Sequence, residues 1–101
     1  MNISITARRF KAHETLKDFI RDEISSFNKY SEDILSAEVI LSYVNNKDSI
    51  KTAEINLLIP GHKITAKEDT DDFKKSISAA SEKITRQLKK IKTKKTVRVK
   101  W

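Results

Sequence analysis

The chain has 101 residues, with 21 Lys and Arg against 14 Asp and Glu, a formal net charge of +7, one Gly and no Cys. This length fits one domain that buries roughly two-thirds of its unfolded surface. The single Gly excludes Gly-rich phosphate-binding loops, and the lack of Cys excludes disulfides, thiolate nucleophiles and zinc knuckles. The longest aliphatic runs are far shorter than the ~20 residues of a membrane span, and no signal-peptide pattern opens the chain. We therefore expect a small, basic, cytoplasmic protein without a membrane partner.

The first half of the chain predicts a strand, a helix and a second strand. Alternating apolar residues predict a strand over Asn2–Thr6. From Glu14 to Tyr30, apolar side chains recur at spacings of three and four, which is typical of one face of an amphipathic helix. The segment Ala37–Val44 is rich in β-branched and aromatic residues and predicts the next strand. Residues 45–48 form a turn by composition.

The second half predicts a hairpin and a long helix. Thr52–Ile59 and His62–Glu68 alternate as strands, and the only Pro and the only Gly of the chain form the tight turn between them. Over Phe73–Ile91 the apolar residues step by three or four, which predicts a helix of about five turns with one apolar stripe. Thr96–Trp101 alternates again and predicts either a short extra strand or a disordered arm.

The predicted order of elements is therefore β-α-β-β-β-α. Because each helix has one apolar face, this order suits an α+β two-layer domain with both helices on one face of a four-stranded sheet. The first crossover makes strands one and two parallel if they are neighbours. Double-stranded RNA-binding modules share this arrangement. We assign residues 1–95 to the domain and residues 96–101 to a short basic tail.

Positive charge is concentrated in the second part of the chain. Residues 1–60 contain 8 basic and 9 acidic side chains, whereas residues 61–101 contain 13 basic and 5 acidic ones. No acid follows Glu82. A block of one sign repels itself unless a polyanion or counterions relieve it. Charge alone leaves three interpretations open: a solubilising tail, a surface for anionic membranes, or a nucleic-acid interface.

Several of these bases form a stripe along the predicted last helix. The stripe consists of Lys83, Arg86, Lys90 and Lys94, and Lys75, Lys89 and Lys92 widen it. Cations spaced by about 5 Å per turn on a rigid rod can meet successive phosphates of a nucleic acid. The competing interpretation is an ordinary solvated helix, but such helices usually carry acids one turn away for support. We favour RNA over DNA, because the chain shows no short recognition helix for the DNA major groove, and duplex over single strands, because the predicted central strands expose no aromatic platform.

Catalytic and metal sites have little support in the sequence. His13 precedes the first predicted helix, where a polar residue commonly acts as a cap, and His62 follows the tight turn. Two histidines without carboxylates at a matching spacing do not suggest a metal site. The acids Asp69, Asp71 and Asp72 could hold Mg²⁺, but a helix cap explains them without a further assumption. We expect no catalytic residue, no cofactor, no metal and no small-molecule substrate.

The order and spacing of several segments resemble a known family. These segments are Asn2–Thr6, Leu16–Phe19, Pro60–Glu68 (PGHKITAKE), Phe73 and Thr85–Lys94 (TRQLKKIKTK). Together they resemble the short form of the ribosome hibernation promoting factors, also called ribosome-associated inhibitor or subunit-interface proteins. The resemblance implies the same β-α-β-β-β-α fold. It also implies binding between the head and body of the small ribosomal subunit, in the path of mRNA and tRNAs, when growth stops.

The resemblance implies which residues contact rRNA. Carried over position by position, they are Lys75, Lys83, Arg86, Lys89, Lys90 and Lys92. We add Arg8 and Arg9 because of their charge and their place in a predicted loop. The expected function is a non-catalytic hibernation factor that inhibits translation at the decoding channel during stress or stationary phase and is monomeric off the ribosome. Two alternatives stay open: a basic protein-interaction module and a general binder of double-stranded RNA.

Overall fold

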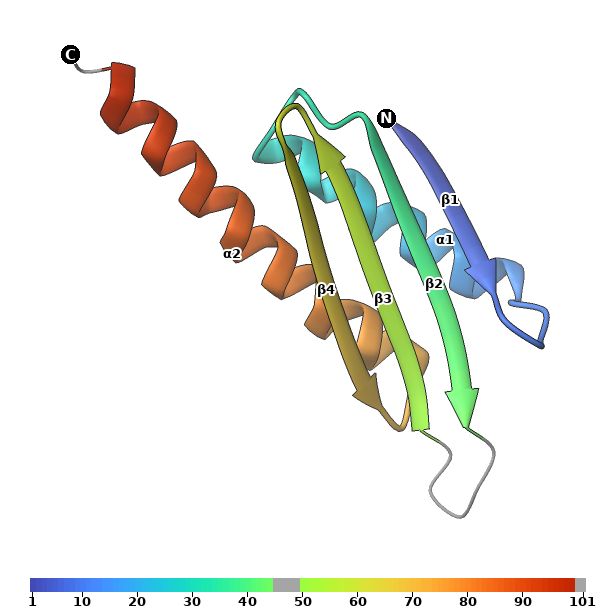
Figure 1. Ribbon diagram of the computed structural model, residues 1–101. Helices are drawn as coiled ribbons and strands as arrows, with labels where there is room; N and C mark the ends of the chain where they lie inside the picture. Colours follow the sequence, from blue (N-terminus) through green and yellow to red (C-terminus); the bar gives the residue numbers. More distant parts are fainter. Residues whose placement is uncertain (45–49, 100–101) are drawn as a thin grey trace.

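The computed structural model describes residues 1–44 and 50–99, with side chains described for residues 1–44 and 50–91. Its elements are β1 (Asn2–Ala7), α1 (Glu14–Ser25), the short 3-10 helix η1 (Ser26–Lys29), β2 (Ser36–Val44), β3 (Ile50–Ile59), β4 (His62–Thr70) and α2 (Phe73–Val99) (Figure 1). The predicted β-α-β-β-β-α order is confirmed. The turn predicted for residues 45–48 lies outside the described residues.

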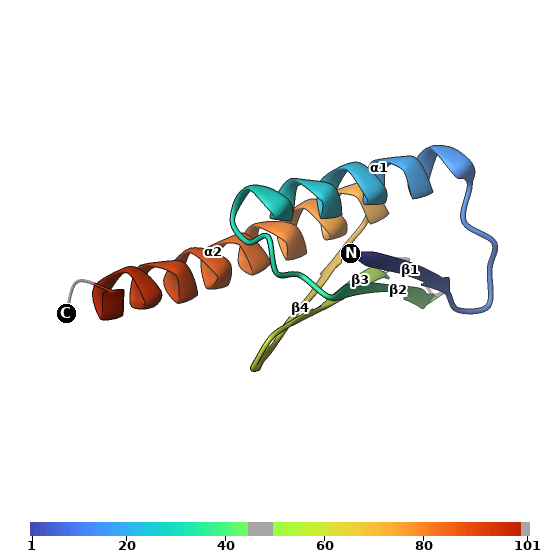
Figure 2. The same ribbon diagram turned by 90° about the horizontal axis from the view of Figure 1, so that it is seen from above.

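The four strands form one sheet in the order β1-β2-β3-β4. β1 runs parallel to β2, with Ile5 opposite Val39, and the other two pairings are antiparallel. The tight turn between β3 and β4 contains Gly61 at φ 78, a conformation that glycine adopts without strain. Both helices lie on the same face of the sheet, so the predicted two-layer architecture is confirmed (Figure 2).

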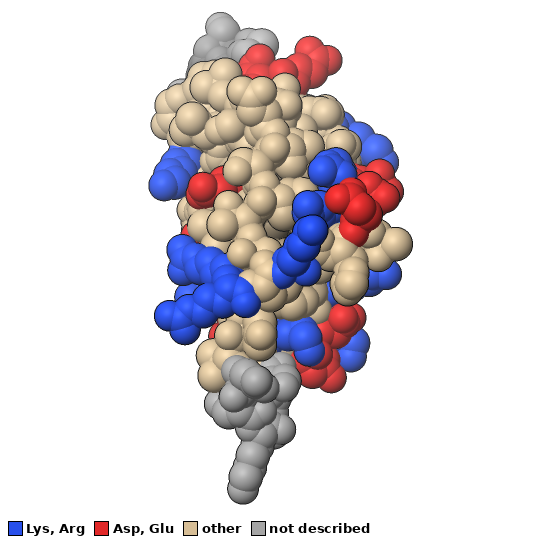
Figure 3. Space-filling view, turned by 90° about the vertical axis from the view of Figure 1, so that its right-hand side faces the viewer, with Lys and Arg blue, Asp and Glu red and all other residues tan. Residues whose placement is uncertain are grey.

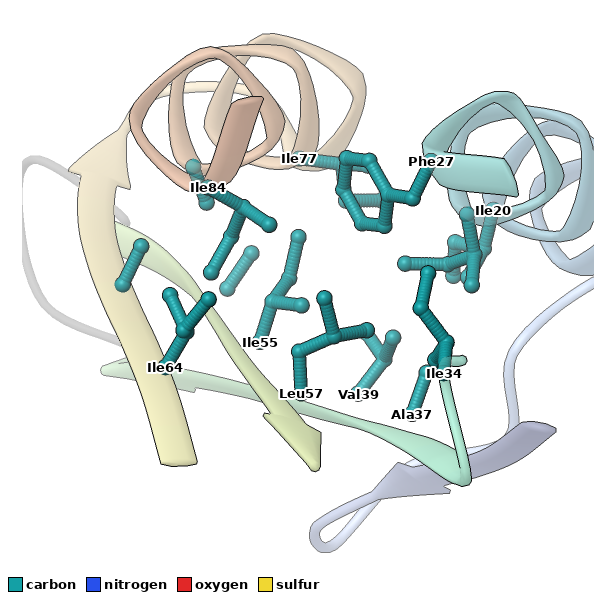
Figure 4. Close-up of a cluster of buried hydrophobic side chains, with 14 of the residues drawn as sticks. Ile20, Phe27, Ile34, Ala37, Val39, Ile55, Leu57, Ile64, Ile77 and Ile84 are labelled. Atoms are coloured by element: carbon teal, nitrogen blue, oxygen red, sulfur yellow. The ribbon is translucent and has the colours of Figure 1, made fainter. Parts of the chain in front are cut away.

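The core fills the space between the sheet and the helices. Alternate side chains of the strands point towards the helices, and Val39, Ile55 and Leu57 are completely buried. Phe27 of η1 and Ile84 of α2 enter the same cluster from the helical layer (Figure 4). Burying each such side chain contributes roughly 1.5–3 kcal/mol. The periodicity of the sequence therefore identified the buried faces correctly.

Two boundaries differ from the sequence expectations. The helix expected over Glu14–Tyr30 changes to the tighter η1 after Ser25. The last helix does not stop near Ile91 but continues to Val99, so the expected strand or disordered arm is wrong over residues 96–99. No Gly or Pro follows Phe73 to end the helix. Residues 100–101 lie outside the described part of the chain.

The start of α2 is anchored to the sheet by a buried hydroxyl group. Ser76 is completely buried, and its Oγ donates a hydrogen bond to the carbonyl oxygen of Lys51 on β3 at 2.7 Å. The same Oγ lies 2.7 Å from Thr70 Oγ1, which accepts a hydrogen bond from the Asp72 N–H at 3.1 Å. The contacts join β3, the end of β4 and the first turn of α2, and so fix where the helix begins.

Replacing Ser76 by Ala is expected to lower the free energy of unfolding by about 1–3 kcal/mol, because the Lys51 carbonyl loses its donor from α2. Chemical denaturation followed by circular dichroism measures this change. Ser78→Ala is the matched control on the same helix: Ser78 is exposed and its bond to Glu23 is 3.4 Å long. Both changes gain the same helix propensity, so equal unfolding free energies would show that the anchor contributes nothing.

Candidate nucleic-acid interface

The outward side of α2 carries the larger group of predicted RNA-binding residues. The apolar stripe of this helix packs on β3 and β4. With about 3.6 residues per turn, burial of that stripe turns Lys83, Arg86, Lys89 and Lys90 towards solvent, and all four are exposed. We call these four residues the α2 basic group. They extend over ~10 Å of helix, a spacing suited to more than one phosphate of an RNA backbone.

Two members of the α2 basic group are paired with acids. Lys83 Nζ lies 2.5 Å from Glu68 Oε1 on β4, with side chains 50% and 26% exposed. Arg86 Nη2 lies 2.6 Å from Glu82 Oε1, one turn earlier in α2. Arg86 thus has the supporting acid that an ordinary solvated helix would show. Because exposed ion pairs contribute at most about 1 kcal/mol, phosphates can replace these carboxylates at small cost.

The other two members of the group lie in the next turn of α2. Lys89 Nζ lies 5.5 Å from the centre of the Tyr30 ring, a cation–π contact that ties α2 to the residue following η1. Lys90 is exposed and has no ion-pair partner among the side chains that the structure describes. Its charge is therefore open to a ligand on the outward side of the helix.

Two further predicted residues of α2 lie outside the α2 basic group. Lys75 precedes Lys83 by eight residues, or ~12 Å, and pairs with Asp71 at 3.3 Å. Lys92 belongs to the described helix backbone, but its side chain lies outside the described residues. Lys75 therefore forms part of the same helix side but not of the same cluster.

Arg8 and Arg9 lie in the connection between β1 and α1, near the start of α2. Phe10 beside them stacks on Phe73, with ring centroids 5.1 Å apart. Since Lys83 follows Phe73 by ten residues, or ~15 Å of helix, the two arginines lie near the start of α2 and not beside the α2 basic group. Arg9 has φ 65, a left-handed conformation that costs about 1 kcal/mol or more for a residue with a Cβ atom. The predicted site residues thus form two groups rather than one.

The structure adds two side chains that the sequence did not single out. Glu68 continues the inward row of Ile64 and Ala66 along β4, and reaches Lys83 from under α2. The sequence feature that could have predicted the Glu68–Lys83 pair is an acid at an inward position of the predicted strand. Lys74 lies over the Phe19 ring at 5.7 Å, between α2 and α1. Lys74 follows Phe73, the first residue of the apolar stripe, and nothing in this position predicted a contact with Phe19.

The excess positive charge does not cover the molecule evenly. On the side shown in Figure 3, Lys and Arg side chains are interleaved with Asp and Glu side chains, and a band of uncharged side chains runs between them. The net charge of +7 therefore does not form one continuous basic surface on this side of the molecule.

The histidines and aspartates assemble no chemical site in the described residues. His13 occupies the N-cap position of α1 but makes no side-chain cap hydrogen bond. Asp69 accepts a hydrogen bond from Thr52 at 2.7 Å. Among the described residues, no three His, Asp or Glu side chains come together in a way that could hold a metal. Neither helix, as far as it is described, combines the length and the apolar character needed to cross a membrane.

Two solved structures share this fold. They are the N-terminal domain of Protein Y from Thermus thermophilus and a ribosomal subunit interface protein from Coxiella burnetii, both with a TM-score of 0.81 and 24% sequence identity. The alignments cover 90% and 92% of this chain and 99% of each of those chains. At this identity the likeness establishes the arrangement of helices and strands.

Relatives by sequence cover most of the chain. A ribosome hibernation promotion factor of Deinococcus radiodurans is 30% identical over 91 residues, which are 88% of this chain and 48% of that protein, so this chain spans about half its length. A ribosome hibernation promoting factor of Pseudomonas putida is 26% identical over 94 residues, 93% of this chain and 89% of that protein. The model of the family described as sigma 54 modulation protein / S30EA ribosomal protein matches residues 3–96, and the resemblance inferred from the sequence is confirmed. The chain therefore belongs to this family of ribosome hibernation factors, which are binding proteins and not enzymes.

Proposed function

We propose that this protein binds the rRNA of the small ribosomal subunit at the decoding channel and inhibits translation during stress or stationary phase. The α2 basic group is the observation that carries the proposal, because it offers four exposed cations on one side of a packed helix. Membership of a ribosome hibernation family supports a ribosomal partner. Under this proposal the protein acts in the cytoplasm and is a monomer off the ribosome.

The physical basis of binding is the exchange of counterions. Each phosphate that meets a Lys or Arg side chain releases condensed cations, which favours binding at low salt. A single phosphate displaces one weak carboxylate pair and gains little, since the ammonium or guanidinium group was already neutralised. Several phosphates held at fixed spacing by folded rRNA displace the pairs of Lys83 and Arg86 together and also meet Lys90.

Inhibition then requires only that the domain occupies the path of mRNA and tRNAs. α2 has 27 residues and is therefore ~40 Å long. Its C-terminal part extends past the sheet as a helical rod (Figure 1). We assign ribosome binding to residues 1–95, and the helix continues from there to Val99 without a break.

Removing two charges of the α2 basic group, by Arg86→Gln with Lys90→Gln, is expected to weaken binding to purified small subunits about tenfold or more at physiological salt. The slope of log K against log salt should fall by about 2. The control is Lys63→Gln with Lys67→Gln, two exposed lysines on the opposite face of the sheet with the same charge change. Co-sedimentation measures both.

Equal affinities and slopes for the two double variants would contradict the proposal. Two further outcomes would replace it. Equally tight binding of bare RNA duplexes would favour a general double-stranded RNA binder. A protein partner that survives RNase treatment, with no rRNA recovered, would favour an interaction module.

Glu68→Gln is expected to strengthen binding to small subunits a few-fold and to raise the salt slope by about 1. Without the Glu68 carboxylate, the charge of Lys83 is no longer neutralised before Lys83 meets a phosphate. Glu54→Gln, on the outer face of the sheet, makes the same change in net charge and should leave the slope unchanged. Titration at several salt concentrations measures both. If Glu68→Gln instead binds small subunits more weakly, Glu68 positions Lys83 and does not compete with the phosphate.

A further inference from the structure

Three aromatic rings lie next to one another where β2 ends, beside the start of α2. Phe10 stacks on Phe73, with centroids 5.1 Å and planes 14° apart, and it meets Tyr43 edge-on, at 5.5 Å and 77°. Phe10 and Phe73 are partly buried against the core. Tyr43 is 41% exposed. A ring that is held by neighbouring rings yet open to water is suited to stack against an unpaired base.

Tyr43 is exposed because β2 continues past the helical layer. It follows the buried Leu41 by two residues, so its side chain belongs to the same side of the sheet as the core. The helices no longer cover the strands at this level, and the lower ends of β2 and β3 in Figure 1 extend past α1 and α2. On the helical side of the sheet, Phe10 in the β1–α1 connection contacts the Tyr43 ring.

Two arginines follow β1, the strand next to β2. Ala7 lies opposite Leu41 in the parallel pair, and the Arg8 N–H donates to the Leu41 carbonyl at 2.9 Å. The chain therefore brings Arg9 to the level of Tyr43. Arg9 is exposed and has φ 65, and such strained residues persist where a function or the surrounding structure requires them. An exposed aromatic ring and an arginine at the same level of the sheet combine the two groups that single-stranded RNA needs.

Among the described residues at this end of the sheet, Asp69 and Asp71 lie on the β4 side. Asp69 lies at the end of β4, two strands away from β2, and is bonded to Thr52. Asp71 follows β4 and pairs with Lys75. Both acids are separated from the β1 edge by β2 and β3.

We propose that Tyr43 stacks on an unpaired RNA base while Arg9 contacts an adjoining phosphate. The identity of the RNA rests on the proposed function: if the protein binds the ribosome, the stacked base is an unpaired base of rRNA. The stacking site lies near the start of α2, ~15 Å of helix before the α2 basic group. Single-strand-binding domains cover roughly 4–16 nucleotides, so one RNA segment can occupy both sites.

The test measures the affinity of the full chain for a short single-stranded RNA oligonucleotide and for purified small ribosomal subunits. Tyr43→Phe keeps the ring and should leave both affinities unchanged. Tyr43→Leu keeps apolar bulk but loses the ring, and should weaken both about tenfold. Arg9→Asn keeps a residue that tolerates the left-handed conformation and should weaken both several-fold, with a salt slope lower by about 1.

Val44→Ala is the matched control at the neighbouring position. Val44 is 54% exposed, so the change removes apolar surface at the same end of the sheet without removing a ring, and both affinities should stay unchanged. Thermal unfolding followed by circular dichroism establishes that each variant is folded. A loss in Val44→Ala as large as that in Tyr43→Leu would overturn stacking in favour of simple apolar contact.

The two RNAs separate this proposal from the proposed function. Normal subunit and oligonucleotide binding by Tyr43→Leu would overturn the stacking site and leave the ribosomal function standing. Tyr43-dependent binding of the oligonucleotide, together with no binding of small subunits by the unmodified chain, would support the stacking site and overturn the ribosomal function. No binding of either RNA by the unmodified chain would overturn both.

Discussion

The packing of α2 against β3 and β4 is the constraint on which the rest of the structure depends. Ile77, Ile84 and Leu88 are almost completely buried, and each contributes roughly 1.5–3 kcal/mol. A rotation of the helix by one residue, about 100°, would move bases into the core and isoleucines into water. The core therefore sets the direction in which every base of α2 points. The buried Ser76 hydroxyl sets where along the sheet the helix starts.

The same helix supplies core and charged surface, and the structure keeps the charges partly compensated. Glu68 and Glu82 neutralise Lys83 and Arg86 in the absence of a ligand. These pairs are weak enough to exchange, yet they reduce the attraction for any isolated phosphate. The arrangement favours a polyanion that presents several phosphates at a matching spacing. Under the proposed function, it makes the affinity of this chain of net charge +7 for RNA local rather than general.

Much of the fold followed from the sequence because burial imposes a period on it. A strand covered on one face repeats every two residues and a helix about every 3.6. These patterns predicted all four strands, both main helices and the buried faces of the helices, β3 and β4. Errors occurred where the pattern stops constraining the chain. Beyond Ile91 the helix has left the sheet, so its apolar residues no longer report a buried stripe, and the alternation of Thr96–Trp101 was misleading.

The sequence by itself determined that the four residues of the α2 basic group share one helix side, since spacings of three and four allow nothing else in a helix with a buried stripe. Only the tertiary structure decided which bases are paired, because Glu68 and Lys83 come from different elements. It also separated Arg8 and Arg9 from the α2 basic group, and the parallel pairing of β1 with β2 brought the chain after β1 level with the end of β2. Contacts between residues far apart along the chain depend on strand order and helix packing, and no local pattern in the sequence encodes those distances.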